Sequence, residues 1–311
     1  MLDLDAIRAF VEVVETGGFS RAAGRIGVST SLISRRVSGL EAELGARLLV
    51  RTTRGVSPTE AGLDFKLRAE RILADLEDAR EAVAESGHAL VGTLRVALPL
   101  SFGLRHVQPL LTELALEHPR LKIEASYADA VVDLVADRFD AAVRLGVLAD
   151  SSLVARRIAP IHAALAASPS YLARRSRPTA LADLADHDAV LQTGMRQGEA
   201  WRFEDGKRTI TVRPEPRFRA DNGQAVLQAA IAGLGIALLP TFLLADAIEA
   251  GSLEPLQLGQ PAGDAALYVV RPPGPASAKV RVFIDRMAER FGGEPSWDAC
   301  ALHRSRMKPA S

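Results

Sequence analysis

The segment from residue 18 to 54, GFSRAAGRIGVSTSLISRRVSGLEAELGARLLVRTTR, concentrates positive charge in a chain whose formal net charge is zero. It holds seven arginines and two acidic residues, Glu41 and Glu43, which gives a local charge of +5. Guanidinium groups suit phosphate oxygens and guanine edges, because both accept paired hydrogen bonds from a planar donor. Since the remainder of the chain carries the compensating acids, we expect any contact with nucleic acid to be confined to this segment.

Short helices and a tight turn are predicted to position these arginines. Apolar residues at 4, 7, 11 and 14 share one face of a first helix. Ser20 is placed to cap a short second helix, and Ser29 to cap a third helix that runs to Leu44 and stops at Gly45. The pattern, over about residues 19–38, is that of a helix-turn-helix, whose second helix enters the major groove with its N-terminal residues over base edges.

The residues expected to touch DNA lie on the polar face of the third helix and on the segment that follows it. Arg35 can contact a guanine edge with two hydrogen bonds, worth about 1–3 kcal/mol of discrimination. The arginines at 36, 51 and 54 are expected to contact phosphates, the last two from a two-stranded wing within ARLLVRTTRGVSP. The alternative is that the arginines only solvate a helix face. The predicted DNA-binding residues are Ser20, Thr30, Ser31, Ser34, Arg35, Arg36, Arg51 and Arg54.

A long, charge-rich helix is predicted over 59–90. Its apolar residues recur at heptad spacing, which favours pairing with a second copy of the chain over packing on a small domain. The alternative is an amphipathic helix that lies on its own chain. The residues of this seam are Phe65, Ala69, Ile72, Leu76, Ala79 and Val83.

Residues 91–292 alternate predicted strands with predicted helices, one of them over 129–138, and this predicts βαβ units with a parallel sheet. The last strand and helix are expected to return to the first half, with crossings near Ile161 and Ala265. This gives lobe I as 91–161 and 266–292, and lobe II as 162–265. The fold class is therefore α/β, after an N-terminal domain over 1–58. Residues 293–311, which include Cys300, show no period and are predicted to be a disordered tail.

Several predicted strand ends in this region are polar, and ligands of open sheets bind outside the carboxyl ends of strands. A helix that begins near Asn222 adds free N–H groups that favour an anion. The positive charge of Arg144 favours an anionic effector as well. Each residue also has a plain structural reading, such as a helix cap or a surface ion pair. The candidate effector-binding residues, of which Phe102, Leu145, Gly146 and Gly194 are added through the resemblance described next, are Ser101, Phe102, Arg144, Leu145, Gly146, Gln192, Thr193, Gly194, Asn222 and Gly223.

The stretch AFVEVVETGGFSRAAGRIGVSTSLISRRVSGLEAELGARLLVRTTRGVSPTEAG closely resembles the N-terminal domain of LysR-type transcriptional regulators. The resemblance rests on FSRAA, VSxxxxSR, LExxLGxRLxxRTxR and xTxAG, and GTLRVALPLSFG and GLGIALLP extend it over about residues 2–292. It implies a winged helix-turn-helix, a linker helix, and a two-lobed domain similar to periplasmic solute-binding proteins, with a small effector between the lobes. Implied partners are operator DNA, an effector such as an anionic carboxylate, RNA polymerase, and further copies in a homodimer or a dimer of dimers.

Other classes of function find little support in the sequence. There is no GxSxG motif, and the six histidines stand apart without metal-ligand spacing, so neither an enzyme nor a cofactor is expected. The acidic start MLDLDAIRAF does not resemble a secretory signal, and no apolar run is long enough for a membrane helix, so we expect a cytoplasmic protein. The remaining alternatives are an architectural DNA-binding protein that reads no sequence, and a small-molecule-binding protein or enzyme with an appended DNA-binding domain.

Overall fold

The computed structural model describes residues 3–52, 55–83, 90–193, 200–205, 208–293, 295, 297 and 298. These residues form two compact units, residues 1–88 and 89–311. Each unit has its own hydrophobic core.

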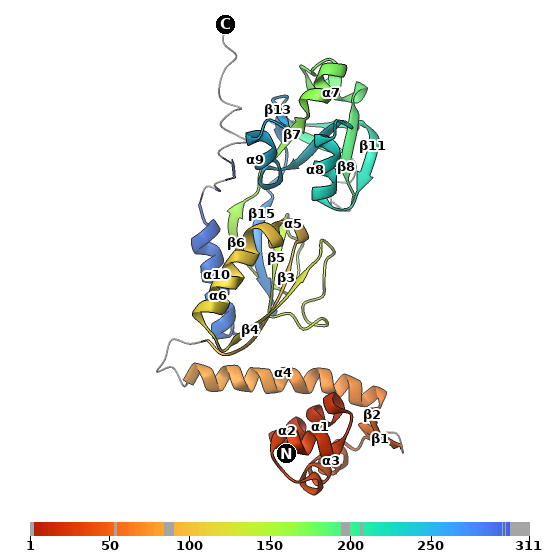
Figure 1. Cartoon of the computed structure of the whole chain (residues 1–311), viewed down its shortest axis with the longest axis vertical. Helices are drawn as coiled ribbons and strands as arrows, with labels where there is room; N and C mark the ends of the chain where they lie inside the picture. Colours follow the sequence, from red (N-terminus) through yellow and green to blue (C-terminus); the bar gives the residue numbers. More distant parts are fainter. Residues whose placement is uncertain are drawn as a thin grey trace. The chain divides into compact units, whose positions relative to one another are not determined.

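The first unit packs three helices around the buried face of α1 (Figure 1). Ser29 Oγ accepts from the amide of Leu32 at 3.3 Å and caps α3, and Gly45 ends that helix with φ +61°, so both predicted signals are confirmed. The predicted cap at Ser20 is wrong: the N-cap is Gly18, two residues earlier, and Ser20 lies in the first turn of α2. The elements are α1 (Leu4–Thr16), α2 (Phe19–Ile26), α3 (Thr30–Leu44), β1 (Leu49–Thr52), β2 (Gly55–Pro58) and α4 (Glu60–Val83).

The predicted wing exists, and side chains of the neighbouring helices fix its base. The Glu41 carboxylate, on α3, accepts from the amides of Leu48 and Leu49 at 2.7 and 2.9 Å. Strands β1 and β2 pair antiparallel beyond that point. A Cβ on Gly62 would lie 2.0 Å from the Leu48 carbonyl oxygen, so only glycine lets α4 pass this close to the wing.

Helix α4 differs from the prediction of a seam directed entirely at a second copy. Ala69 is fully buried in the core of the first unit, and the Phe65 ring meets the Phe10 ring edge-on at a centroid distance of 5.5 Å. Leu73 also packs on this core, whereas Ile72 is 46% exposed. The first part of α4 therefore rests on its own chain, because the helix-turn-helix needs an apolar cover on this side.

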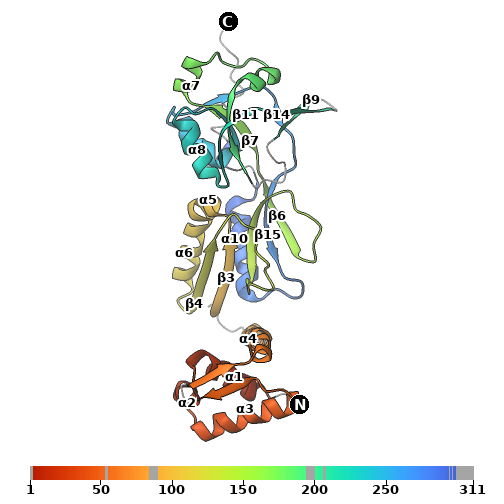
Figure 2. The ribbon, with the colours of Figure 1, turned by 90° about the vertical axis from the view of Figure 1, so that its right-hand side faces the viewer.

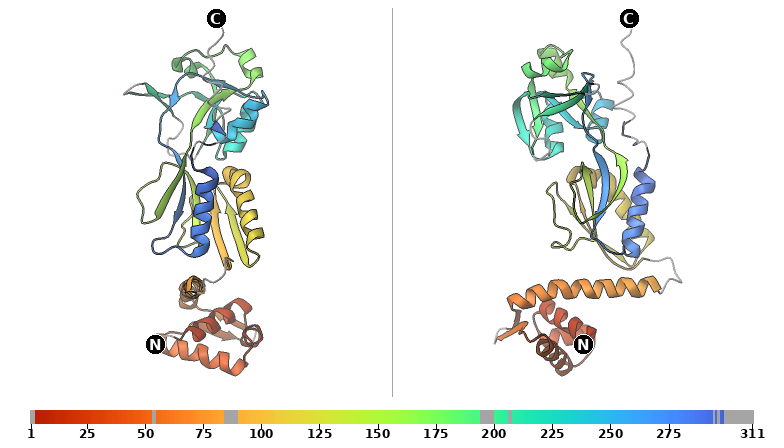
Figure 3. Two further views of the ribbon diagram at one scale, coloured as in Figure 1. Left: turned by 90° about the vertical axis from the view of Figure 1, so that its left-hand side faces the viewer. Right: turned by 180° about the vertical axis from the view of Figure 1, so that it is seen from behind.

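The second unit contains two lobes, each built on a five-stranded sheet (Figures 2 and 3). In lobe I the order is β4-β3-β5-β15-β6, with α6 and α10 packed on one face and the loop over 128–139 on the other. The elements are β3 (Gly92–Leu98), α5 (Leu100–Phe102), the π-helix η1 (Gly103–Val107), α6 (Gln108–Glu117), β4 (Leu121–Tyr127), β5 (Ala141–Gly146), β6 (Val154–Pro160), β15 (Ala266–Arg271) and α10 (Ala278–Phe291).

Lobe II has the strand order β11-β8-β12-β7-β13 and a small second sheet, β10-β9-β14. Asn222 caps α8 by accepting from the amides of Gln224 and Ala225, which confirms the predicted helix start. The elements are β7 (Ala163–Ala167), α7 (Pro169–Arg174), the 3-10 helix η2 (Leu181–Asp186), β8 (Asp188–Gln192), β9 (Trp201–Asp205), β10 (Arg208–Val212), β11 (Glu215–Ala220), α8 (Gly223–Ile231), β12 (Ile236–Pro240), α9 (Thr241–Glu249), β13 (Glu254–Leu256) and β14 (Gln260–Pro261).

The chain passes between the lobes where β6 leads into β7 and where it returns to β15. The two passages lie side by side, because the amide of Ile161 donates to the carbonyl of Ala265 at 2.9 Å. The sheets are mixed rather than parallel: β15 runs antiparallel to β5 and β6, and β7 runs antiparallel to β12 and β13. Mixed order follows from a chain that leaves each lobe and re-enters it.

Two further predictions are wrong. Residues 129–138 form turns rather than a helix, because the Asp133 carboxylate binds the amides of Val135 and Ala136 and so competes with helical hydrogen bonds. The tail is not uniformly loose, since Trp297 is 8% and Asp298 7% exposed. Cys300 lies outside the described residues.

Candidate functional site

The outer face of α3 carries the polar side chains that the sequence predicted for DNA contact. Thr30, Ser31 and Arg35 are exposed and Ser34 is half-buried, while Ile33 and Val37 on the opposite face are fully buried. No acidic residue occurs between Ser29 and Leu40. The face therefore offers hydroxyl and guanidinium groups to a negatively charged surface, on a helix held rigidly from behind.

Among the clustered arginines whose side chains the structure describes, Arg25 and Arg36 have acidic partners inside the first unit. Arg36 binds Asp5 of α1 with 2.5 Å between nitrogen and oxygen, and its side chain is only 23% exposed. Arg25 pairs with Glu12 and Glu15 at 3.5 and 3.4 Å. These pairs hold α1 against its neighbours, so the charge of the segment serves the fold as well as any ligand.

The structure also shows two residues that the sequence reasoning left out of the site. Ser38 is exposed on the same side of α3 as Ser34 and Arg35, and the helical period could have found it. Arg47 is exposed between α3 and the wing. The Arg51 side chain and Arg54 lie outside the described part of the structure.

In the second unit, one group of predicted residues converges where lobe II faces lobe I. A Cβ on Gly223 would stand 3.2 Å from Oε1 of Gln192, so the end of β8 touches the start of α8. Thr193 extends this edge, its amide donating to the carbonyl of Ala220 at 2.7 Å. Asn222 completes the group as the cap of α8.

Asp129 of lobe I, absent from the predicted set, contacts this group directly. Its Oδ2 accepts from the Asn222 side-chain amide at 2.7 Å, and its Oδ1 accepts from the amide of Leu100 at 3.0 Å. Ser101 follows Leu100 and is half-buried. Asp129 comes just after the carboxyl end of β4, so the strand-end rule that selected the other residues could have selected it too.

The other predicted residues that the structure describes are engaged elsewhere. The Arg144 guanidinium donates to the carbonyl of Val132 at 3.0 Å, and burial lowers the pKa of this side chain. Phe102 is fully buried among the rings of His106, Phe242, Phe291 and Trp297. Leu145 packs on the core, and Gly146 ends β5 with φ +118°. Gly194 lies outside the described residues.

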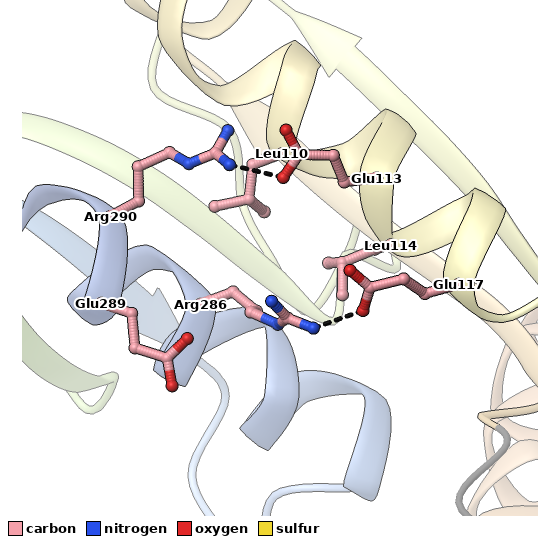
Figure 4. A pocket seen from close by; sticks show the side chains of 7 residues that line it. All are labelled: Leu110, Glu113, Leu114, Glu117, Arg286, Glu289 and Arg290. Carbon is pink, nitrogen blue, oxygen red and sulfur yellow. Dashed lines mark hydrogen bonds and ion pairs between the residues drawn. The ribbon is translucent and has the colours of Figure 1, made fainter.

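A surface pocket of about 230 Å³ lies elsewhere in lobe I, between α6 and α10 (Figure 4). Arg286 pairs with Glu117 across it, and Arg290 pairs with Glu113. None of the predicted effector residues lines it. Within the described ranges there is no cluster of three potential metal ligands, and no helix is long and apolar enough to cross a membrane.

Comparison with known proteins covers both units. Residues 4–63 match the model of the bacterial regulatory helix-turn-helix proteins of the lysR family, and residues 87–292 match the LysR substrate binding domain. The regulator PtxR of Pseudomonas aeruginosa is 33% identical, over 94% of this chain and 95% of its own. CrgA of Neisseria meningitidis serogroup C is 32% identical, over 93% and 97%.

Solved structures agree with these matches. CrgA from Neisseria meningitidis, described as a LysR-type transcriptional regulator, superposes with a TM-score of 0.60 and 31% identity, over 93% of this chain and 99% of its own. The full-length Vibrio cholerae virulence activator AphB gives a TM-score of 0.58 and 28% identity, over 92% and 99%. A helix-turn-helix matched in one unit and an effector-type domain matched in the other lead to one conclusion: this chain belongs to the LysR-type transcriptional regulators, which are DNA-binding proteins and not enzymes.

Proposed function

We propose that this regulator reads its operator through α3. Thr30, Ser31, Ser34 and Arg35 contact base edges, while Arg36, Arg51 and Arg54 contact phosphates and Ser20 lies at the edge of the same interface. The observation that carries this assignment is the exposed, acid-free outer face of α3 on a buried, apolar inner face. For Arg36 to bind a phosphate, the phosphate must replace Asp5.

The regulator acts as a homodimer or as a dimer of dimers. Leu63 and Leu67, one turn apart on α4, are 52% and 44% exposed, and a second copy of the helix would remove both from water. Two copies would then present two recognition helices to two half-sites of one operator. In this proposal the assembled protein acts in the cytoplasm, where it meets DNA and RNA polymerase.

The effector binds between the lobes, against Ser101, Gln192, Thr193, Asn222 and Gly223. The side-chain oxygen of Asn222 accepts from the α8 amides, so its NH₂ group must point outward and donate. A carboxylate effector would take the place that the Asp129 carboxylate holds now. Effector binding shifts the protein only by its differential affinity for two interlobe arrangements.

The test is a DNA-binding titration against the upstream intergenic region and against random DNA, at two salt concentrations. We expect about a thousandfold preference for the upstream fragment, which lies in the usual specific-to-non-specific range. Equal binding to both fragments, fading alike as salt rises, would favour the architectural alternative. An operator located elsewhere is distinguished by repeating the titration with a genomic fragment library.

A further inference from the structure

The chain continues past the matched LysR domain, which ends at residue 292, and three described residues of this continuation, Pro295, Trp297 and Asp298, are buried. We call Trp297 and Asp298 the C-terminal clasp. Burial of a carboxylate needs hydrogen-bond partners that offset the loss of water, and Asp298 has them. Trp297 is held by ring contacts with both lobes, and its Nε1 is buried without a hydrogen-bond partner.

Trp297 packs on rings of both lobes. Its ring centroid lies 5.6 Å from that of Phe102 and 4.8 Å from that of His106, both in lobe I, and 6.4 Å from that of Phe242 on α9 of lobe II. Phe102 and Phe242 also meet each other edge-on at 5.1 Å. The indole therefore completes an aromatic contact between the lobes, and any rotation that separates Phe102 from Phe242 would also uncover it.

Asp298 binds residues next to the first passage between the lobes. Its Oδ2 lies 2.7 Å from Nδ1 of His162, the residue that follows the crossing at Ile161. Its Oδ1 accepts from the hydroxyl of Thr241 at 2.5 Å, and Thr241 is fully buried at the start of α9. The amide of Thr241 also donates to the carbonyl of His162. The carboxylate thus anchors the C-terminal clasp to lobe II, at the residue that follows the first passage and at the start of α9.

We propose that the C-terminal clasp holds the two lobes in one arrangement and so sets the free-energy difference that an effector must overcome. Only the second part, the effect on an effector, rests on the proposed function. The first part does not, because the clasp contacts the lobes whether or not an effector is present. A neighbouring ion pair also joins the lobes: Arg105 of lobe I pairs with Asp246 of α9. A hollow of about 390 Å³ beside Trp297 is lined by Arg105, His106 and Pro295 among others.

The experiment measures the distance between the lobes in the full-length protein by pulsed electron spin resonance. Cys300→Ser removes the single cysteine, and spin labels are attached at Leu116→Cys on α6 and Gln228→Cys on α8, both exposed. In the otherwise unaltered chain we expect one narrow distance population. Asp298→Ala and Trp297→Ala should each add a second population or shift the first, and chain termination after Gly292 should do so most.

Trp201→Ala is the matched control. Trp201 is the only other tryptophan and is 6% exposed, and its buried cluster among the described residues lies in lobe II, so its removal should leave the distances unchanged. If a clasp variant fails to fold, Trp297→Phe and Asp298→Asn serve in its place. Their circular dichroism and unfolding transitions are recorded beside the distances.

Unchanged distances in folded clasp variants would overturn the proposal, as would equal broadening by Trp201→Ala. Tryptophan emission gives a second readout in Trp201→Phe, where Trp297 is the remaining fluorophore. Blue-shifted emission that turns red in Asp298→Ala supports the clasp, and emission typical of exposed indole in the parent contradicts it. Since neither readout uses DNA or an effector, a negative operator titration would count against the proposed function and leave these results standing.

Discussion

The polar face of α3 and the polar group around Asn222 between the lobes differ in the hydrogen-bond partners that their side chains already have. Thr30, Ser31 and Arg35 are exposed on a helix whose other face is buried, although the Ser31 hydroxyl lies 3.1 Å from that of Ser29. Asn222 and the amide of Leu100 are instead bound to the Asp129 carboxylate. In the proposed function, the outer face of α3 meets a partner that docks from outside, with Asp5 replaced at Arg36, whereas the interlobe group must exchange the Asp129 carboxylate for its ligand.

The largest effect is expected from Gly62→Ala. It tests whether DNA binding by the outer face of α3 requires the close packing of α4 on the base of the wing. The added Cβ would meet the Leu48 carbonyl oxygen at 2.0 Å, a backbone contact that no rotamer relieves. We expect the first unit to lose more than about 2 kcal/mol of stability, and operator binding to disappear.

Gly24→Ala is the matched control, because nothing lies within 4 Å of the Cβ it adds inside α2. Alanine should stabilise that helix by about 0.5–1 kcal/mol. Chemical denaturation and DNA titration of both variants decide the point. Similar stabilities for the two variants would show that α4 and the wing can separate.

Arg35→Ala tests base readout on the same surface. Loss of a bidentate guanine contact should cost about 1–3 kcal/mol, or roughly 5- to 150-fold in operator affinity, with little change on random DNA. Arg54→Ala should weaken binding to both DNAs alike and reduce the salt slope by about one. Titrations of each variant on operator and random fragments at several salt concentrations measure both quantities. If Arg35→Ala lost affinity equally for operator and random DNA, Arg35 would be a phosphate contact and not a base contact.

Asp129→Asn tests the second surface. Removing the internal carboxylate should raise the affinity for a carboxylate effector by about 1 kcal/mol, roughly fivefold, the contact being exposed. Calorimetric titration with a carboxylate panel measures the change, and Arg144→Ala in the same panel tests whether that guanidinium takes part. Asp150→Asn, an exposed charge loss elsewhere in lobe I, is the control. A similar gain in both aspartate variants would mean that net charge, and not the Asn222 contact, governs affinity.

A smaller effect is expected for the pH dependence of the stability of the second unit. Burial, and secondarily the nearby Arg105, lowers the pKa of His106 from 6.5 to about 4, against the opposing charge of Asp246. The unfolded chain therefore takes up a proton near pH 6.5 that the folded chain refuses until about pH 4, so stability falls as pH drops through this window. Because His106 is partly exposed, we expect about 1 kcal/mol between pH 7 and 5.

The measurement is denaturant unfolding of the second unit at pH 7, 6 and 5 in the parent and in His106→Phe. Phenylalanine keeps a ring among Phe102, Phe242 and Trp297 but cannot take up a proton. The difference in stability between the two proteins should narrow or reverse toward low pH. Parallel curves would remove His106 as the cause.

Local signals in the sequence predicted much of the fold. Ser29, Gly45 and Asn222 act through neighbours within a few residues, so their roles as caps and stops are legible without the structure. Strand direction was not legible in the same way, because it depends on where the chain re-enters each lobe.

The candidate sites were predictable to different degrees for the same reason. The face of α3 follows from helical periodicity, while the interlobe group depends on contacts across long sequence separations, such as Asp129 with Asn222. Phe102 was included through the family pattern, yet its ring faces the core. The acids at 129, 133 and 137 ended a predicted helix by binding nearby or more distant amides, a competition that apolar spacing does not reveal.

The bonds from Glu41 to the amides of Leu48 and Leu49 have a consequence for the speed and geometry of docking. They join α3 to the base of the wing, so in the proposed interface the two elements would dock together. A duplex whose grooves are bent or spaced differently would then have to deform to fit both. We expect such an interface to respond to the mechanical stiffness of a sequence at positions that no side chain touches.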